Sequence, residues 1–423
     1  MNILVVEKTY PWPEVSGSHI RVANVVRALA TLGEVDFFFL SRDRSIPDGA
    51  PVDEPVARFG AAPRAPSRHP RIPRNARLLG WLASSRLPVA LGLRDYSEVR
   101  SIFRAWARPR YDLAWVGRAL CHAAIGDHVL APTVVDLDDL EDQRIGAWLE
   151  IAAGEGETNA STGGLRRWAS RAVNTANVRR WRELQHRTAS SVESVVVCSE
   201  LDRLRLRAPN AAVIPNGYAE PVRPLGRVEV AAPPTLMLAG ALGWAPNVDA
   251  ARFLAAEVFP RLRARIPGAQ LRIVGEHDDR VEDLRSLEGV TLAGFVPDMA
   301  AELLRADVVA VPIRFGSGTR VKILEAFAHR IPVVSTTLGC EGLDVIPGRH
   351  LLVADDAEAF ARACMDLLVD VELRERLAAA AHELYRHRYR WPVIAPAIVE
   401  LARGVAERRQ SSRAPGHVAG GAG

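Results

Sequence analysis

The sequence feature that most restricts the fold is the stretch Val308–Ala328, VVAVPIRFGSGTRVKILEAFA. It opens with an apolar run of strand length, passes through the loop Phe315-Gly316-Ser317-Gly318-Thr319, and closes with apolar residues at helical spacing. A buried strand that leads through glycines into a helix is a unit of α/β folds, and its loop is a common place to hold phosphate. The stretch therefore predicts a parallel sheet with a ligand loop at its edge.

The residues after the glycines indicate which ligand this loop holds. Thr319 is an N-cap candidate. Arg320 and Lys322 follow in the first helical turn, where the helix dipole disfavours cations unless an anion binds there. Glu325 lies one turn further along the same face, and its carboxylate can accept hydrogen bonds from two sugar hydroxyls. The pattern predicts a bound polyanion, and an ordinary loop with a solvated Glu325 is the alternative.

Longer segments around this loop resemble a known family. GTRVKILEAFAHRIPVVSTTLGCEGL resembles the donor-binding segment of retaining glycosyltransferases of the GT-B fold, in glycosyltransferase family 4 (glycosyl transferases group 1). The similarity extends from LMLAGALGWAPNVDAARFL near residue 236 to HLLVADDAEAFARACMDLL near residue 368, and more weakly over the first 140 residues. One departure is Ser317, which stands where the family often carries a second acid, eight residues before the helix glutamate.

The resemblance implies a reaction and a set of residues. It implies transfer of a sugar from a nucleotide diphosphate donor to an acceptor that the resemblance leaves open, with the anomeric configuration retained and with neither metal nor cofactor. A departing diphosphate gains negative charge, so Arg320 and Lys322 would stabilise the transition state. Glu325 would hold the ribose. The implied donor-binding residues are Gly240, Gly316, Gly318, Thr319, Arg320, Lys322 and Glu325.

A second glycine-led helix is predicted near the amino terminus. Ile3–Val6 has a buried-strand pattern, apolar residues recur at helical spacing from Ser18, and Val35–Leu40 is a second strand. Gly17 stands at the helix start, with Arg21 one turn in. This βαβ beginning predicts a site for an acceptor phosphate or for the donor diphosphate, and a simple turn at Gly17 is an equal alternative.

Acidic residues cluster after the predicted strand Thr133–Leu137, at the end where open α/β sheets place their chemistry. The family often carries D-x-H-D here, with its histidine near the reacting sugar, and Asp138 occupies the histidine position. We therefore expect Asp138 to be catalytic. A metal-binding D-x-D motif is disfavoured because the second half has its own phosphate loop, and acids that cap the next helix are an alternative. The predicted acceptor-side residues are Gly17, Ser18, Arg21, Asp136 and Asp139.

Composition restricts the partners and the compartment. The 423-residue chain has a net charge of +4 and a pI of about 9.1, which is mild for a nucleic-acid-binding protein. Its four cysteines include no close pair, so neither a disulfide framework nor a metal motif is predicted. No signal peptide precedes the first strand, and no apolar run has membrane-spanning length. We expect a cytoplasmic protein with no nucleic-acid partner.

One basic segment predicts contact with a membrane surface. Residues 42–94 are rich in arginine and proline, and Leu78, Leu79, Trp81 and Leu82 supply apolar bulk beside the cations. We expect residues 58–86 to contact anionic lipid on the inner face of the membrane. A solvated insertion is an alternative of equal weight.

Two α/β halves joined by a proline-rich linker predict the architecture. The expected fold class is α/β, with two Rossmann-like domains whose parallel sheets face a cleft (GT-B). The predicted parts are residues 1–217 for the acceptor-side domain, 218–234 for the linker, 235–390 for the nucleotide-sugar-binding domain, 391–410 for a last helix that packs on the first domain, and 411–423 for a disordered tail.

Other functions are compatible with the same pattern. Nucleotide-sugar epimerases and hydrolases share the fold and need no acceptor, so incubation with donor alone separates an epimerase from a transferase. A catalytically degenerate sugar-nucleotide-binding subunit is a further alternative, because Ser317 and Asp138 replace the usual acid and histidine. A dinucleotide dehydrogenase is disfavoured because no G-x-G-x-x-G follows the first strand.

Overall fold

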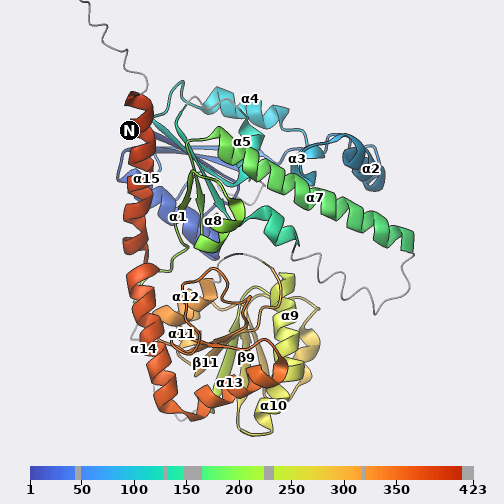
Figure 1. The fold of residues 1–423 in the computed structure, drawn as a ribbon, viewed down its shortest axis with the longest axis vertical. Coiled ribbons are helices and arrows are strands. Elements are labelled where there is room, and N and C mark those ends of the chain that lie inside the picture. The colour runs from blue at the N-terminus through green and yellow to red at the C-terminus, as the bar shows by residue number, and fades with distance from the viewer. Residues whose placement is uncertain are drawn as a thin grey trace, which may run out of the picture. The chain divides into compact units, whose positions relative to one another are not determined.

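The computed structural model describes residues 1–42, 49–126, 131–146, 164–222, 233–316, 318 and 321–411 (Figure 1). Within these residues the chain forms two compact units, the first made of residues 1–142, 164–214 and 395–411 and the second of residues 143–146 and 215–394. Three residues of the predicted donor loop lie outside the described residues, namely Ser317, Thr319 and Arg320. Residues 412–423 of the predicted tail also lie outside them.

The first unit is built on a parallel sheet. Among the described residues its strands are ordered β3-β2-β1-β4-β5-β6-β7, and all neighbours pair in parallel. Continuous apolar runs suit a sheet that is covered on both faces, and Ile3–Val6 is fully buried. The strands are β1 (Asn2–Glu7), β2 (Glu34–Arg42), β3 (Arg58–Pro63), β4 (Leu113–Gly117), β5 (Thr133–Asp138), β6 (Ser194–Val197) and β7 (Ala211–Val213).

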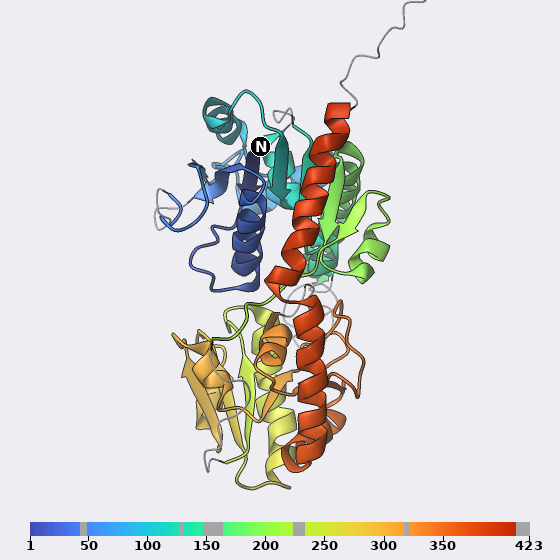
Figure 2. The same cartoon turned by 90° about the vertical axis from the view of Figure 1, so that its left-hand side faces the viewer.

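Helices cover both faces of this sheet (Figures 1 and 2). α1 (Gly17–Ala30) lies on one face, whereas α4 (Ser97–Trp106), α5 (Arg118–Ile125) and α7 (Gly164–Ser191) lie on the other. The strand order reverses between β1 and β4, and such a reversal is where open α/β sheets place their ligands. The shorter helices are α2 (Arg74–Ser84), α3 (Val89–Gly92) and α8 (Glu200–Leu206).

The second unit repeats this plan with a parallel sheet ordered β10-β9-β8-β11-β12-β13. Its order reverses between β8 and β11. The two sheets confirm the predicted α/β class with two Rossmann-like domains. The strands are β8 (Thr235–Ala239), β9 (Gln270–Val274), β10 (Val290–Gly294), β11 (Val308–Val311), β12 (Val333–Ser335) and β13 (Leu352–Val353). The helices are α9 (Ala245–Phe253), α10 (Phe259–Arg263), α11 (Met299–Leu303), α12 (Val321–Ala328), α13 (Ala357–Val369) and α14 (Val371–Arg388), with a π turn (Leu254–Val258) between α9 and α10.

The last helix, α15 (Trp391–Ser411), brings the chain back to the first unit. From residue 395 onward it belongs to that unit, although it follows the whole of the second unit in the sequence. Its side chains Ile398, Ala402 and Val405 recur at i, i+4 and i+7 and are fully buried. The first unit is therefore completed by α15, which follows the second unit in the sequence.

The described part of the predicted linker is attached to the second unit, which corrects its assignment as a connector. Tyr218 donates its backbone N–H to the carbonyl of Tyr389 at 2.9 Å, and the Tyr385 hydroxyl donates to the carbonyl of Ala219 at 2.8 Å. Tyr385 lies in α14, and Tyr385 and Tyr389 are both buried. Residues 223–232 of this segment lie outside the described residues.

The arginine-rich segment is more ordered than its composition predicts. Trp81 of α2 is buried and donates its ring N–H to the carbonyl of Leu87 at 2.7 Å. The Cζ atom of Arg180 lies over the Trp81 ring, 3.8 Å from its centroid. Trp81 is therefore a packing residue and not exposed bulk, whereas Leu79 is 61% and Ile72 44% exposed. In the described part of the chain, no helix combines the length and the apolarity that crossing a bilayer requires.

Candidate functional site

The glycines at the ends of β8 and β9 bring two backbones into contact in the second unit. Gly240 (φ 145°) and Gly275 (φ 142°) both adopt a conformation that L side chains rarely take. A Cβ on Gly275 would overlap the Gly240 carbonyl, and a Cβ on Gly240 would lie 2.9 Å from the Lys322 ammonium. The bare backbone of Gly240 thus lets a cation from α12 reach the end of β8.

Lys322 is held at this position by a neutral side chain. Its Nζ donates to Asn247 Oδ1 at 2.7 Å, and Asn247 Nδ2 donates to the Ala241 carbonyl at 2.8 Å. Asn247 is buried in α9, so the amide is fixed while it orients the ammonium. The sequence pattern had not identified Asn247 as a residue of this site.

Glu325 lies further along α12 and meets a residue of the predicted linker. Its Oε1 accepts a hydrogen bond from the Tyr218 hydroxyl at 2.6 Å. Burial raises the pKa of Glu325, and the hydrogen bond from Tyr218 and the charge of Lys322 lower it in part. Glu325 is therefore an oriented acceptor and not a solvated helix residue, and Tyr218 is a further site residue that the sequence had not shown.

The glycine loop has the backbone geometry that its composition predicted. Gly316 (φ 97°) and Gly318 (φ 98°) both lie in the left-handed region, which other residues adopt at a cost. A Cβ on Gly316 would lie 3.2 Å from Pro246 and 3.3 Å from Trp244, so the loop runs close to the start of α9. In the second unit, Gly240, Lys322 and this loop all lie near the start of α9.

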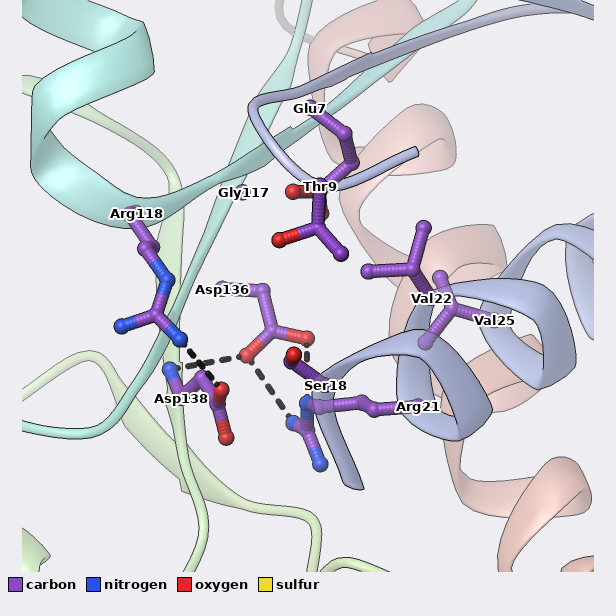
Figure 3. A pocket seen from close by; sticks show the side chains of 10 residues that line it. All are labelled: Glu7, Thr9, Ser18, Arg21, Val22, Val25, Gly117, Arg118, Asp136 and Asp138. Atoms are coloured by element: carbon purple, nitrogen blue, oxygen red, sulfur yellow. Dashed lines mark hydrogen bonds and ion pairs between the residues drawn. The ribbon is translucent and has the colours of Figure 1, made fainter. Parts of the chain in front are cut away.

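A recess of about 290 Å³, which includes the part open to solvent, lies in the first unit (Figure 3). It is located at the carboxyl ends of β1, β4 and β5 and beside the start of α1, where the strand order reverses. Of the predicted residues it brings together Ser18, Arg21, Asp136 and Asp138, whereas Gly17 and Asp139 are not part of its lining. The lining residues are Glu7, Thr9, Ser18, Arg21, Val22, Val25, Gly117, Arg118, Asp136 and Asp138.

Arg21 and Asp136 form a buried ion pair in this recess, and this changes the role predicted for Arg21. Arg21 Nε and an Nη each donate to one Asp136 oxygen at 2.9 Å, and its other Nη donates to the Ile214 carbonyl at 3.1 Å. Both side chains are about 95% buried or more. The guanidinium therefore fastens α1 to β5 and to the end of β7, and its charge is balanced by a carboxylate instead of a phosphate.

Asp138 is also paired, with an arginine that the sequence pattern missed. Arg118 donates to Asp138 Oδ2 at 2.8 Å, and the Cys198 thiol donates to Oδ1 at 3.2 Å. Arg118 (φ 65°) and Asp138 (φ 53°) both have left-handed backbones, although neither is glycine. Such conformations cost about 1–3 kcal/mol each and persist at functional sites when their surroundings hold them. Both residues lie at the ends of the adjacent strands β4 and β5, where they line the recess.

Glu7 is a further acid of the recess, and sequence reasoning also missed it. It is the last residue of β1 and is 6% exposed. Burial, with a smaller contribution from Asp136, raises the pKa of its carboxyl to about 8, and Arg118 opposes the shift. A polar residue at the end of the apolar run ILVV was the available signal.

The two aspartates of the recess each have an arginine partner. Asp136 is bonded to Arg21 and Asp138 to Arg118. Across the residues that the structure describes, no group of three or more His, Cys, Asp or Glu side chains is arranged to hold a metal ion.

Comparison with known proteins identifies the second unit. Residues 233–370 match the sequence profile of the family described as Glycosyl transferases group 1. The matched range contains Gly240, Asn247, Lys322 and Glu325. Over these residues the chain is similar to the glycosyl transferases group 1 family.

Relatives and solved structures extend this result to the fold of the whole chain. A phosphatidyl-myo-inositol mannosyltransferase of Mycobacterium leprae (strain TN) is 35% identical over 159 residues, which are 36% of this chain and 42% of that protein. The chain thus spans about two fifths of the length of such curated relatives. Sucrose-phosphate synthase from Thermosynechococcus elongatus has a TM-score of 0.69 at 20% identity, over 96% of this chain and 99% of that one. Anabaena HepE in complex with UDP-glucose has a TM-score of 0.59 at 15% identity, over 97% and 100%. Together with the two sheets, these likenesses show that the chain has a GT-B fold.

Proposed function

We propose that the chain is a glycosyltransferase that uses a nucleotide diphosphate sugar, retains the anomeric configuration and needs no metal. The observation that carries the proposal is the position of Lys322 over the bare backbone of Gly240, oriented by Asn247. The structure of HepE was determined with UDP-glucose, which supports a nucleotide sugar as the class of donor.

The donor diphosphate would lie between the Gly316–Gly318 turn and Lys322. Negative charge develops on the diphosphate as the glycosidic bond breaks, so a cation already in place stabilises the transition state more than the ground state. The amino-terminal end of α12 adds a favourable dipole. Arg320, from its position in the sequence, would supply a second cation. These groups together replace the charge that a metal ion would bring.

Glu325 would hold the ribose of the nucleotide. Tyr218 fixes Oε1, and Oε2 would then accept hydrogen bonds from ribose hydroxyls. These hydroxyls do not change during the reaction, so the contact contributes to donor binding and not to the rate of the chemical step. The acceptor would bind in the first unit, in the recess that contains Asp138.

A donor screen followed by a transfer assay tests this proposal. Nucleoside diphosphates that bind the folded chain raise its melting temperature, which identifies the nucleotide. The corresponding nucleotide sugars are then incubated with and without lipid and sugar acceptors. Transfer that needs an acceptor supports the proposal, whereas conversion of the donor alone would indicate an epimerase or a hydrolase.

Metal independence has its own test. Turnover should survive excess EDTA, because Lys322 and the start of α12 neutralise the diphosphate without a metal ion. Complete loss with EDTA and recovery with Mg²⁺ or Mn²⁺ would contradict this part of the proposal. That outcome would indicate Asp136, Asp138 and Asp139 as metal ligands.

We further propose that the product is a glycolipid or another glycoconjugate made at the inner face of a membrane. The M. leprae relative is by name a phosphatidyl-myo-inositol mannosyltransferase, and α2 exposes Leu79 close in sequence to exposed Arg71, Ile72 and Arg74. Each such cation near an anionic surface contributes about 1 kcal/mol, which salt screens. Sedimentation with anionic vesicles should fall in the variant Arg71→Glu/Arg74→Glu. Equal sedimentation with neutral vesicles would contradict an electrostatic contact.

A further inference from the structure

The recess of the first unit is nearly neutral, and this restricts what it can bind. Its two arginines both have carboxylate partners, because Arg21 pairs with Asp136 and Arg118 pairs with Asp138. Arg118 also lies 3.5 Å from a Glu141 oxygen. A phosphate or carboxylate group of a ligand would therefore meet cations whose charge is already balanced, and the nearby acids would repel it.

Glu7 provides the group in this recess that is suited to an uncharged ligand. Its carboxyl lies against the backbone of Gly117, where a Cβ would overlap it, and Figure 3 shows it beside Thr9 in the lining of the recess. A carboxyl with a raised pKa stays protonated near neutral pH, so it can both donate and accept a hydrogen bond. A sugar or polyol hydroxyl has the same two capacities.

We propose that this recess binds an uncharged hydroxyl group of the sugar acceptor, and that the Glu7 carboxyl orients that hydroxyl by donating and accepting one hydrogen bond each. The proposal rests on the glycosyltransferase function proposed above and specifies the chemical class of its acceptor: a neutral polyol or sugar at the contacting position, not a phosphorylated one. Gly117 is a positioning residue in this arrangement, because its missing side chain leaves room for the carboxyl. No covalent step is assigned to Glu7.

The pH dependence of acceptor binding follows from the same arrangement. The charged and titratable groups around Glu7 are Asp136 and Asp138 on β5, Arg118 and Cys121 on α5, Arg21 on α1, and the neighbouring Lys8. Both arginines remain charged over the accessible range. Ionisation of Glu7 above about pH 8 therefore removes the donated hydrogen bond and adds a negative charge beside Asp136.

Binding of neutral and phosphorylated probes separates this proposal from the general one. The full chain, saturated with its nucleoside diphosphate, is titrated with myo-inositol and methyl α-D-glucopyranoside, and with inositol 1-phosphate and glucose 6-phosphate, by saturation-transfer NMR. We expect the neutral probes to bind and their affinity to fall at least fivefold between pH 7 and pH 9. Tighter binding of the phosphorylated probes, or no binding of the neutral ones, would overturn the proposal. Failure of every nucleoside diphosphate to bind would instead contradict the glycosyltransferase function.

Two variants test the role of Glu7, and a matched glycine variant controls for them. Glu7→Ala removes the carboxyl and Gly117→Ala displaces it. Both variants should therefore bind the neutral probes at least tenfold more weakly, while the affinity for the nucleoside diphosphate stays unchanged. Glu7→Gln keeps a donor and an acceptor, so it should stay within about threefold of wild type at pH 7 and should lose the pH dependence. Gly80→Ala, whose Cβ would meet nothing within 4 Å, should behave like wild type. Wild-type affinity and an unchanged pH profile in the folded Glu7→Ala and Gly117→Ala variants would overturn the proposal.

Discussion

The two units each begin a helix with glycine at the carboxyl end of a parallel sheet, but they use the cation of that helix in opposite ways. In the first unit, Arg21 of α1 is buried against Asp136, 115 residues away in the sequence. In the second unit, Lys322 of α12 is bonded to the neutral amide of Asn247. A cation one turn into a helix therefore does not define an anion site by itself. The two helices differ in the partner that a distant element brings to the cation, a carboxylate for Arg21 and an amide for Lys322.

The strongest test of this comparison is the stability of the buried pair. Arg21→Ala leaves Asp136 buried without its partner, and we expect it to lower the free energy of unfolding by about 3–5 kcal/mol. Lys322→Ala should lower it by less than about 1 kcal/mol, because the Lys322 side chain is only half-buried. Chemical denaturation measures both. The exposed pair of Arg362 and Glu358 provides a control, since Arg362→Ala should change stability by less than about 1 kcal/mol.

For transferase activity we expect the reverse order, with a larger loss in Lys322→Ala than in Arg21→Ala. Lys322→Ala removes a cation that meets developing charge, so kcat should fall by about 10²–10³ and donor affinity should fall as well. Steady-state kinetics with the identified donor measures both parameters, and Asn247→Ala should show a smaller loss because it only orients the lysine. Transfer that remains within twofold of wild type in Lys322→Ala would place the donor site elsewhere.

Glu7 is expected to lower the free energy of unfolding in a pH-dependent way. The pKa of Glu7 is about 8 in the folded chain and its ordinary value is 4.5, so the unfolded chain ionises first as the pH rises. The cost of keeping Glu7 protonated is thus absent below about pH 4.5 and grows up to about pH 8. Glu7→Gln should stabilise the protein at pH 7 by about 3 kcal/mol and should have little effect at pH 4. Melting curves of the two proteins at both pH values measure this, and an equal difference at pH 4 and pH 7 would contradict it.

The smallest effect is expected at the ribose contact. Tyr218→Phe removes the hydrogen bond to Glu325, which contributes about 1 kcal/mol, so the donor KM should rise about fivefold with kcat unchanged. Glu325→Ala should raise the donor KM further by the same mechanism. A drop in kcat without a change in KM for either variant would show that Glu325 acts on the reacting centre and not on the ribose.

The features that the sequence predicted well are local, and the ones it missed are pairings across the chain. Apolar strand runs and the spacing of Gly316, Lys322 and Glu325 follow from residues within a single βα unit, so pattern alone locates them. Asn247 and Tyr218 meet those residues from 75 and 107 positions away. Because no local periodicity encodes such contacts, the same reasoning assigned Arg21 to a phosphate and overlooked Glu7 and Arg118.

The return of the chain through α15 has a consequence for how the protein is made. Residues 215–394 are contiguous and complete the second unit, whereas the first unit also needs residues 395–411. On the ribosome, the second unit therefore has its whole sequence available before the first unit does, which reverses the usual amino-terminal-first order of domain folding. Until α15 has been synthesised, the surface that receives Ile398, Ala402 and Val405 stays uncovered, so the arrival of this helix is the step that closes the first unit.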